Sequence, residues 1–313
     1  MSHDTLETTG RGLRALLVSL AGLLLTTAFQ AAIALLGGSA GLLAETIHNL
    51  ADAFAALPLG LAFILARREA NRRFTYGYGR AEDVAGAVVI LLILASAGLS
   101  AHASYQKLAQ AETPRYLGWG MLAAAVGIAG NEVVARYKIR VGKEIGSAAL
   151  VADGQHSRAD GLTSLAAFLG LLGARLGWPQ ADGIAGLLIT LFILGIVWET
   201  GRDILSRLMD SVEPGLVAQM ESVAAGVPGV REVPALRARW VGHQLTMEVN
   251  ICADGSKTLV EAHQIAEEVR HTLMHSIPRL NDVVVHVDPV ESRPGEFHQT
   301  TFHHEQSGFL HDG

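Results

Sequence analysis

The sequence predicts an α-helical membrane protein of six transmembrane helices, followed by a small α+β domain outside the bilayer. Half of the 313 residues are hydrophobic and 17% are charged, with a mean hydropathy of +0.32. These values are typical of a membrane protein that carries a soluble part. The charges are unevenly distributed, since residues 208–313 hold 15 of the 30 acidic side chains and 9 of the 13 histidines. This change predicts a domain boundary in the run RLMDSVEPG, near Asp210–Pro214.

Six stretches are long and apolar enough to cross a bilayer, which takes roughly 20 mostly apolar residues. They are residues 12–36, 39–66, 82–108, 116–137, 145–174 and 181–202. Glycine and alanine are frequent in all six, and small residues let membrane helices pack closely. A transmembrane domain over residues 12–208 follows from this pattern.

Lysine and arginine concentrate on one side of the predicted bilayer. They are Arg11 and Arg14 before the first stretch, Arg67, Arg68, Arg72, Arg73 and Arg80 after the second, Arg136, Lys138, Arg140 and Lys143 after the fourth, and Arg202 and Arg207 after the sixth. The other side carries Lys107, Arg115 and Arg175. The positive-inside rule therefore predicts that both termini lie in the cytoplasm, with residues 1–11 forming the N-terminal segment. A multi-pass protein of the inner membrane is expected. The net charge of −6 argues against a nucleic-acid partner.

The second and fifth stretches share a pattern of ionisable residues. Each has an acid, a histidine three positions later and a second acid four positions after that: Glu45, His48 and Asp52 in ETIHNLAD, and Asp153, His156 and Asp160 in DGQHSRAD. These positions share one face of a helix. An ionisable side chain at mid-bilayer costs about 2.5–3.5 kcal/mol on insertion scales, so both stripes are expected to face each other or a water-filled cavity.

Two histidines and two carboxylates suit a tetrahedral divalent ion such as zinc. Side chains four positions apart lie on adjacent turns, so each helix can supply two ligands. The predicted ligands are His48, Asp52, His156 and Asp160. The alternative is a histidine–aspartate hydrogen bond within each helix, and the matching spacing of the two stripes favours the metal. Glu45 and Asp153 are expected to support the histidines as hydrogen-bond acceptors, to relay protons, or to meet water at a helix end. A direct ligand role for these two acids is a further alternative.

Several other classes of protein lack their sequence signatures here. The single cysteine, Cys252, excludes an internal disulfide and a cysteine-based metal cluster. The sequence has no GxxxxGK[ST] motif of an ATP-driven pump and no HExxH motif of a metallohydrolase. A secondary transporter, not an enzyme, is therefore expected. A metal sensor that binds ions without transporting them is the remaining alternative, although a sensor needs no ligands inside the membrane.

Residues 209–290 predict a separate domain with the element order αββαβ. The expected elements are a helix at 214–226, strands at 230–240 and 244–253, a helix at 258–277 and a strand at 282–288. Residues 291–313 contain four histidines and little that could be buried, so a disordered tail that binds metal weakly is expected.

Four segments together resemble the cation diffusion facilitator family: LLAETIHNLAD, FTYGYGRAED, ADGQHSRAD and VVVHVDP. The resemblance covers about residues 12–290 and implies six membrane helices, a cytoplasmic domain of ferredoxin-like fold, and a homodimer in the lipid bilayer. It places His48, Asp52, His156 and Asp160 on the four transport ligands, a set that resembles zinc-preferring members. The implied function is export of zinc from the cytoplasm by proton antiport, without an organic cofactor. Cadmium, cobalt and iron(II) are the alternative ions.

The resemblance implies two further features. A second metal site in the cytoplasmic domain would use His263, His286, Asp288 and Glu248, so zinc would be both cargo and regulator there; the alternative is that His286 packs at a strand end. Arg80 and Asp210 fall where the family has a charge interlock between membrane helices and soluble domain, and the alternative is two separate surface charges.

Overall fold

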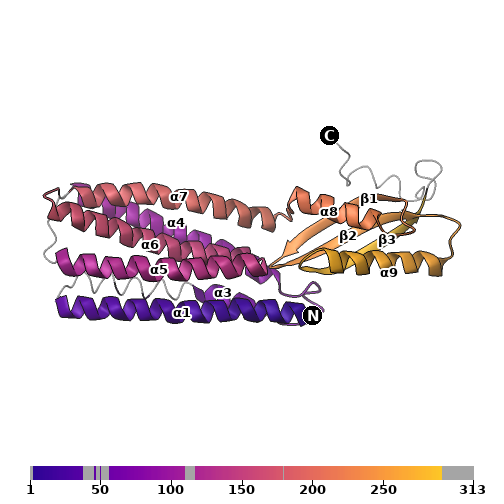
Figure 1. Cartoon of the computed structure of the whole chain (residues 1–313), viewed down its shortest axis with the longest axis horizontal. Coiled ribbons are helices and arrows are strands. Elements are labelled where there is room, and N and C mark those ends of the chain that lie inside the picture. Colours follow the sequence, from indigo (N-terminus) through magenta and orange to yellow (C-terminus); the bar gives the residue numbers. More distant parts are fainter. Residues whose placement is uncertain are drawn as a thin grey trace. The chain divides into compact units, whose positions relative to one another are not determined.

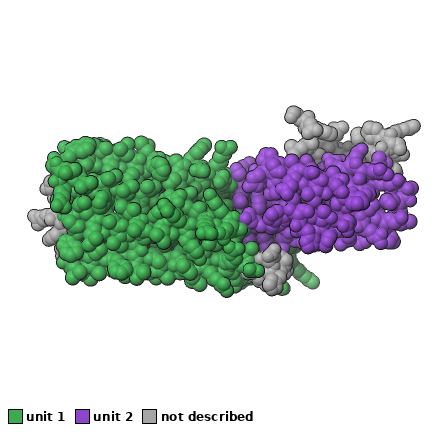
Figure 2. All heavy atoms as spheres, in the orientation of Figure 1, with its two compact units in different colours: residues 1–205 green, residues 206–313 purple. Residues whose placement is uncertain are grey.

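The computed structural model describes residues 3–37, 46, 50, 56–109, 117–178 and 180–290 (Figure 1). The chain divides into two compact units, residues 1–205 and 206–313 (Figure 2). The first unit contains the apolar helices and the second contains the α+β domain.

The helices of the first unit run side by side (Figure 1). They are α1 (His3–Gly37), α3 (Leu57–Ala66), α4 (Arg80–Ala109), α5 (Leu117–Ile145), α6 (Ala148–Arg175) and α7 (Ala181–Leu208), whose last turn enters the second unit. Among the described residues, four segments are long and apolar enough to cross a membrane: Glu7–Ile33, Arg80–Gln106, Leu117–Ile145 and Ala181–Leu208. These confirm the first, third, fourth and sixth predicted spans.

The fifth and second predicted spans have different outcomes. Helix α6 covers the fifth span as one continuous helix, but it is not among the apolar segments because it carries the polar run DGQHSRAD. The short apolar helix α3 covers the end of the second span. Most of the rest of that span lies outside the described residues, so the count of six membrane helices stays a prediction.

The outer surface of the helical unit is apolar and its interior is rich in small residues. Leu91, Phe192 and Trp198 are each more than 60% exposed, whereas alanines such as Ala135 and Ala152 are fully buried. A soluble bundle would bury the large apolar side chains. This arrangement therefore fits helices surrounded by lipid.

Helices α5 and α6 form a closely packed hairpin. The chain turns at Gly146, which has a φ of 77°, and Ser147 caps α6 by accepting a hydrogen bond from the Leu150 backbone N–H at 3.0 Å. Along the contact, a Cβ atom added at Gly154 or Gly161 would lie 2.7 Å or 3.2 Å from side-chain atoms of α5. Glycine has a hydrogen atom in place of a side chain, and this permits the close approach of α5 and α6.

The second unit has the predicted αββαβ order. Its elements are α8 (Pro214–Ala225), β1 (Glu232–Val241), β2 (Gln244–Ala253), α9 (Leu259–Ser276) and β3 (Leu280–Pro289). Within the described part of this unit, the strands form one sheet in the order β1-β2-β3. Strand β2 is antiparallel to β1 and parallel to β3.

The two faces of this sheet differ in character. One face carries Met247, Val249 and Ile251 of β2, which are buried together with residues of α8 and α9 such as Met220 and Leu273. Side chains of a strand alternate between faces, so Glu248, Asn250 and their β3 partners Val284 and His286 lie on the other face. Glu248, Val284 and His286 are exposed.

A candidate metal transport site on helix α6

His156 lies in the middle of α6 and is almost completely buried, with 3% of its surface exposed. Neither ring nitrogen has a hydrogen-bond partner among the described residues. Asp160 is one turn further along α6, and its Oδ1 is 3.9 Å from Nδ1 of His156, beyond hydrogen-bonding distance. Buried polar groups are normally paired. Within the part of the chain that the structure describes, an imidazole with both nitrogens unpaired beside a carboxylate fits a binding site for a divalent cation.

The neighbouring side chains of α6 show where this pair points. Ala152 and Ala159 pack against α4 and α7, whereas Gly154 and Gly161 lie against α5. At 100° per residue, His156 lies closer to the face that carries Ala152 and Ala159 than to the glycine face, and only 3% of its surface is exposed. It therefore faces the interior of the bundle, as predicted from helical periodicity.

The second half of the predicted site, with Glu45, His48 and Asp52, lies outside the described residues. Among the residues that are described, no group of three or more His, Cys, Asp or Glu side chains is close enough to hold a metal ion. His156 and Asp160 therefore represent half of the predicted ligand set, and the joining of the two halves stays a prediction.

Asp153 has a partner that the sequence analysis did not find. Its Oδ2 lies 2.8 Å from Nζ of Lys138, and at most 2% of either side chain is exposed. Lys138 also donates a hydrogen bond to Oγ of Ser157 at 3.1 Å. The lysine contact with Asp153 is an ion pair without hydrogen-bond alignment, because neither carboxylate oxygen of Asp153 has a hydrogen-bond partner among the described residues.

The position assigned to Lys138 from the sequence was wrong. The fourth span was expected to end at residue 137, with Lys138 in a basic loop, but α5 continues to Ile145. Lys138 is therefore an intrahelical residue that points into the α5–α6 contact. In the sequence, Lys138 stands in the charge-rich run RYKIRVGK, whose other basic residues are not buried. The run therefore gives no sign that this one lysine is buried.

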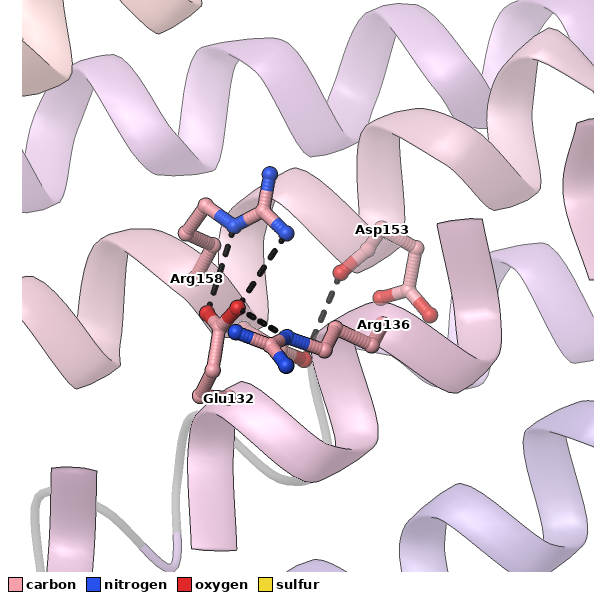
Figure 3. Close-up of polar contacts among 5 residues, drawn as sticks. Glu132, Arg136, Asp153 and Arg158 are labelled. Carbon is pink, nitrogen blue, oxygen red and sulfur yellow. Dashed lines mark hydrogen bonds and ion pairs between the residues drawn. The ribbon is translucent and has the colours of Figure 1, made fainter. Parts of the chain in front are cut away.

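A second charged contact joins the same two helices (Figure 3). Glu132 on α5 accepts hydrogen bonds from Nε of Arg136 at 2.7 Å and from Nε of Arg158 on α6 at 3.3 Å. Arg158 lies two residues after His156, about 200° around the helix. This contact and the Lys138 contact hold α6 at one rotation relative to α5, with His156 directed away from that helix.

In the α+β domain of the second unit, the structure brings together part of the second predicted site. Nε2 of His286 is 3.0 Å from Oδ1 of Asp288, both on β3. Glu248 on β2 lies on the same exposed face of the sheet. His263 is exposed on α9, the helix whose apolar residues pack against the opposite face. A site made of all four residues stays a prediction.

The predicted interlock residues belong to different units. Nη1 of Arg80 is 3.7 Å from Oδ2 of Asp83, within the first turn of α4. Asp210 follows α7 with a φ of 61°. Their pairing stays a prediction, and the histidine-containing tail lies outside the described residues.

Comparison with known proteins identifies the family. The cation efflux transmembrane domain matches residues 16–209, and the cation efflux protein cytoplasmic domain matches residues 212–290. The chain belongs to the cation efflux family. This assignment confirms the resemblance noted in the sequence and the combination of a helical membrane domain with a cytoplasmic α+β domain.

Individual relatives cover most of the chain. A probable cation efflux system protein of Mycobacterium tuberculosis is 45% identical over 288 residues, which are 92% of this chain and 87% of the relative. The manganese efflux system protein MneP of Bacillus subtilis is 28% identical over 282 residues, covering 87% and 94%. A solved MamM C-terminal domain is 32% identical and covers 25% of this chain and 96% of that chain, with a TM-score of 0.24.

Membership of this family establishes divalent cation efflux across a membrane as the activity of the protein. The family consists of transporters, in agreement with the expectation that the protein is not an enzyme. One relative is named for cation efflux and another for manganese efflux, so family membership does not determine which ion this protein transports.

Proposed function

We propose that the protein exports zinc from the cytoplasm in exchange for protons, through a site formed by His48, Asp52, His156 and Asp160. The observation that carries this proposal is the buried and unpaired imidazole of His156. Its ring is buried, both nitrogens are unpaired among the described residues, and the Asp160 carboxylate is one turn away. Burying an unpaired imidazole is unfavourable, and coordination of a cation would satisfy it.

The ligand chemistry supports exchange with protons. Metal ions bind neutral imidazole and ionised carboxylate, so loading the site releases protons. Protonation of the same ligands on the other side of the membrane would then release the ion. A site between helices near mid-bilayer is suited to alternating access by movement of one group of helices against another.

The ligand set also supports the choice of zinc. Imidazole nitrogen suits zinc, whereas manganese prefers carboxylate, carbonyl and water oxygen. Cadmium, cobalt and iron(II) tolerate mixed nitrogen and oxygen ligands and are the competing ions. Manganese, the ion named for the Bacillus subtilis relative, is the competitor that this ligand set disfavours.

The cytoplasmic domain is proposed to hold two copies of the chain together, with both termini in the cytoplasm and the helices in the inner membrane. The match to a cytoplasmic domain of cation efflux proteins supports this role. The exposed sheet face with Val284, His286 and Asp288 supplies apolar surface and metal ligands for the joint. Glu248 shares this face, and His263 would complete the regulatory zinc site from α9.

The test compares two histidine substitutions in the same membrane. His156→Ala removes the proposed ligand, whereas His102→Ala removes an exposed histidine of α4 whose Nε2 contacts Gln106 at 3.0 Å. Inside-out proteoliposomes with an internal zinc and pH dye would report both ions. We expect wild type and His102→Ala to move zinc inward with protons moving outward, and His156→Ala to move neither.

Two outcomes would contradict the proposal. Zinc uptake by His156→Ala at the wild-type rate would remove this residue from the site. A wild-type protein that binds zinc but moves neither ion would favour the metal-sensor alternative. Repeating the assay with cadmium, cobalt, iron(II) and manganese would determine which ion competes best.

A further inference from the structure

Lys138 is the only lysine or arginine among the described residues that is fully buried in the helical unit. A charged side chain inside a membrane protein is unfavourable unless an opposite charge or a polar cavity compensates it. Its ammonium lies 2.8 Å from Asp153 and donates to Ser157. Lys138 and Asp153 therefore form a buried ion pair between α5 and α6, although neither residue is one of the four proposed transport ligands.

Asp153 has the properties of a metal ligand. It lies three positions before His156, so it shares the helix face of His156 and Asp160. Its side chain is 1% exposed, and neither oxygen has a hydrogen-bond partner among the described residues. Without Lys138, α6 would present a second free carboxylate one turn from His156, on the opposite side of the histidine from Asp160.

Building on the proposed transport site, we propose that Lys138 is a specificity-determining residue, which holds the Asp153 carboxylate away from the cargo ion. The ammonium limits α6 to one ligating carboxylate, Asp160. The ligand set then keeps its balance of two imidazoles and two carboxylates, which suits zinc. A third carboxylate would add an oxygen donor and a negative charge, and would favour oxygen-preferring ions such as manganese.

The main alternative is that the pair only joins α5 to α6. A structural contact and a specificity determinant differ in what their removal changes. Loss of a structural contact lowers the amount of folded protein and the transport rate, but leaves affinity and ion preference unchanged. Release of Asp153 toward the ion changes the affinity itself and the preference between zinc and manganese.

The experiment measures zinc and manganese affinity of the full-length protein by calorimetry in detergent, and uptake of both ions in proteoliposomes. The variants are Lys138→Met, Lys138→Arg and the double variant Lys138→Met/Asp153→Asn. We expect Lys138→Met to bind zinc about tenfold more tightly, the scale on which surrounding groups tune metal sites. It should also release zinc more slowly, giving a lower kcat, and should gain manganese uptake.

The other two variants separate charge from packing. Lys138→Arg keeps the cation and should retain the wild-type zinc preference. The double variant removes both charges, and replacing a buried ion pair by neutral groups is often tolerated. It should therefore fold, and its zinc affinity should return to the wild-type value because the additional carboxylate is gone.

The proposal is overturned if Lys138→Met lowers only protein yield and kcat, with unchanged affinity and no manganese uptake. It is also overturned if the double variant folds but keeps an altered affinity, a result that can be obtained even when Lys138→Met does not fold. His156→Ala provides the reference for the proposed function. If His156→Ala leaves zinc affinity unchanged, the transport site itself fails; if His156→Ala abolishes binding while Lys138→Met leaves it unchanged, only the role of Lys138 fails.

Discussion

Replacing Gly154 by alanine tests whether the close approach of α5 and α6 holds the metal ligands in place. A Cβ atom at this position would lie 2.7 Å from Cγ1 and 3.0 Å from the backbone nitrogen of Ile139, and 3.1 Å from Cβ of Lys138. Carbon atoms in good contact are about 3.5–4.0 Å apart. A backbone atom cannot rotate away, so the two helices would have to separate by roughly 1 Å, judged from that contact distance.

The expected size of the effect follows from this overlap. Inserting a methyl group into a well-packed interior typically costs about 1–3 kcal/mol, or roughly 5- to 150-fold in the folding equilibrium. Gly195→Ala on α7 is the matched control, because a Cβ atom there would have nothing within 4 Å. Both variants gain the same intrinsic helix propensity, so their difference isolates the contact.

Thermal unfolding in one detergent and zinc uptake in proteoliposomes would be measured for both variants. We expect Gly154→Ala to unfold at lower temperature and to transport more slowly, because separating the helices also lengthens the Lys138–Asp153 contact. Gly195→Ala should behave as wild type. Equal melting temperatures and equal uptake for the two variants would refute the reasoning about the α5–α6 contact.

Three further predictions follow from other contacts. Glu132→Gln weakens the contact with Arg158. Both side chains are about one-third exposed, so the substitution should lower the free energy of unfolding by no more than about 1 kcal/mol. If Glu132→Gln/Arg158→Gln loses no more stability than Glu132→Gln alone, the contact contributes; if the losses of the two single variants add, it does not. Thr258→Ala removes the capping box of α9, and hydrogen exchange at the start of that helix should accelerate by about fivefold, the equivalent of roughly 1 kcal/mol. The Thr258 backbone N–H and hydroxyl both donate to Glu261 and hold the pKa of that carboxyl below its usual range. The stability that the ionised carboxyl contributes is therefore complete when the pH is above the usual pKa, and it is lost as the pH falls through the lowered pKa. Protection of α9 should therefore decrease in acid in wild type and depend less on pH in Glu261→Gln.

The cytoplasmic domain was predictable because its signals are local. VVVHVDP is a short run of strand-forming residues, and the strand β3 runs over Leu280–Pro289. Thr258 followed three residues later by Glu261 marks the start of α9, within the predicted helix. Such local patterns need no knowledge of distant parts of the chain.

The candidate site was predictable only in part, for a physical reason. Helical periodicity was enough to predict that His156 and Asp160 lie on the same face of α6, directed into the bundle. The partner of Asp153 was not predictable in this way, because Lys138 precedes it by 15 positions on another helix. A hydropathy pattern ends a membrane span where charges begin, and it cannot recognise a charge that another helix neutralises.

The tight turn at Gly146 and Ser147 has a consequence for how the chain enters the membrane. Helix α6 carries too many polar residues to be among the apolar segments, whereas α5 is apolar enough to insert and carries the cation that neutralises Asp153. We expect the two helices to partition into the bilayer together during synthesis, α5 making the entry of α6 favourable. An α6 segment presented alone to an insertion assay should remain outside, while the α5–α6 pair with Lys138 intact should integrate.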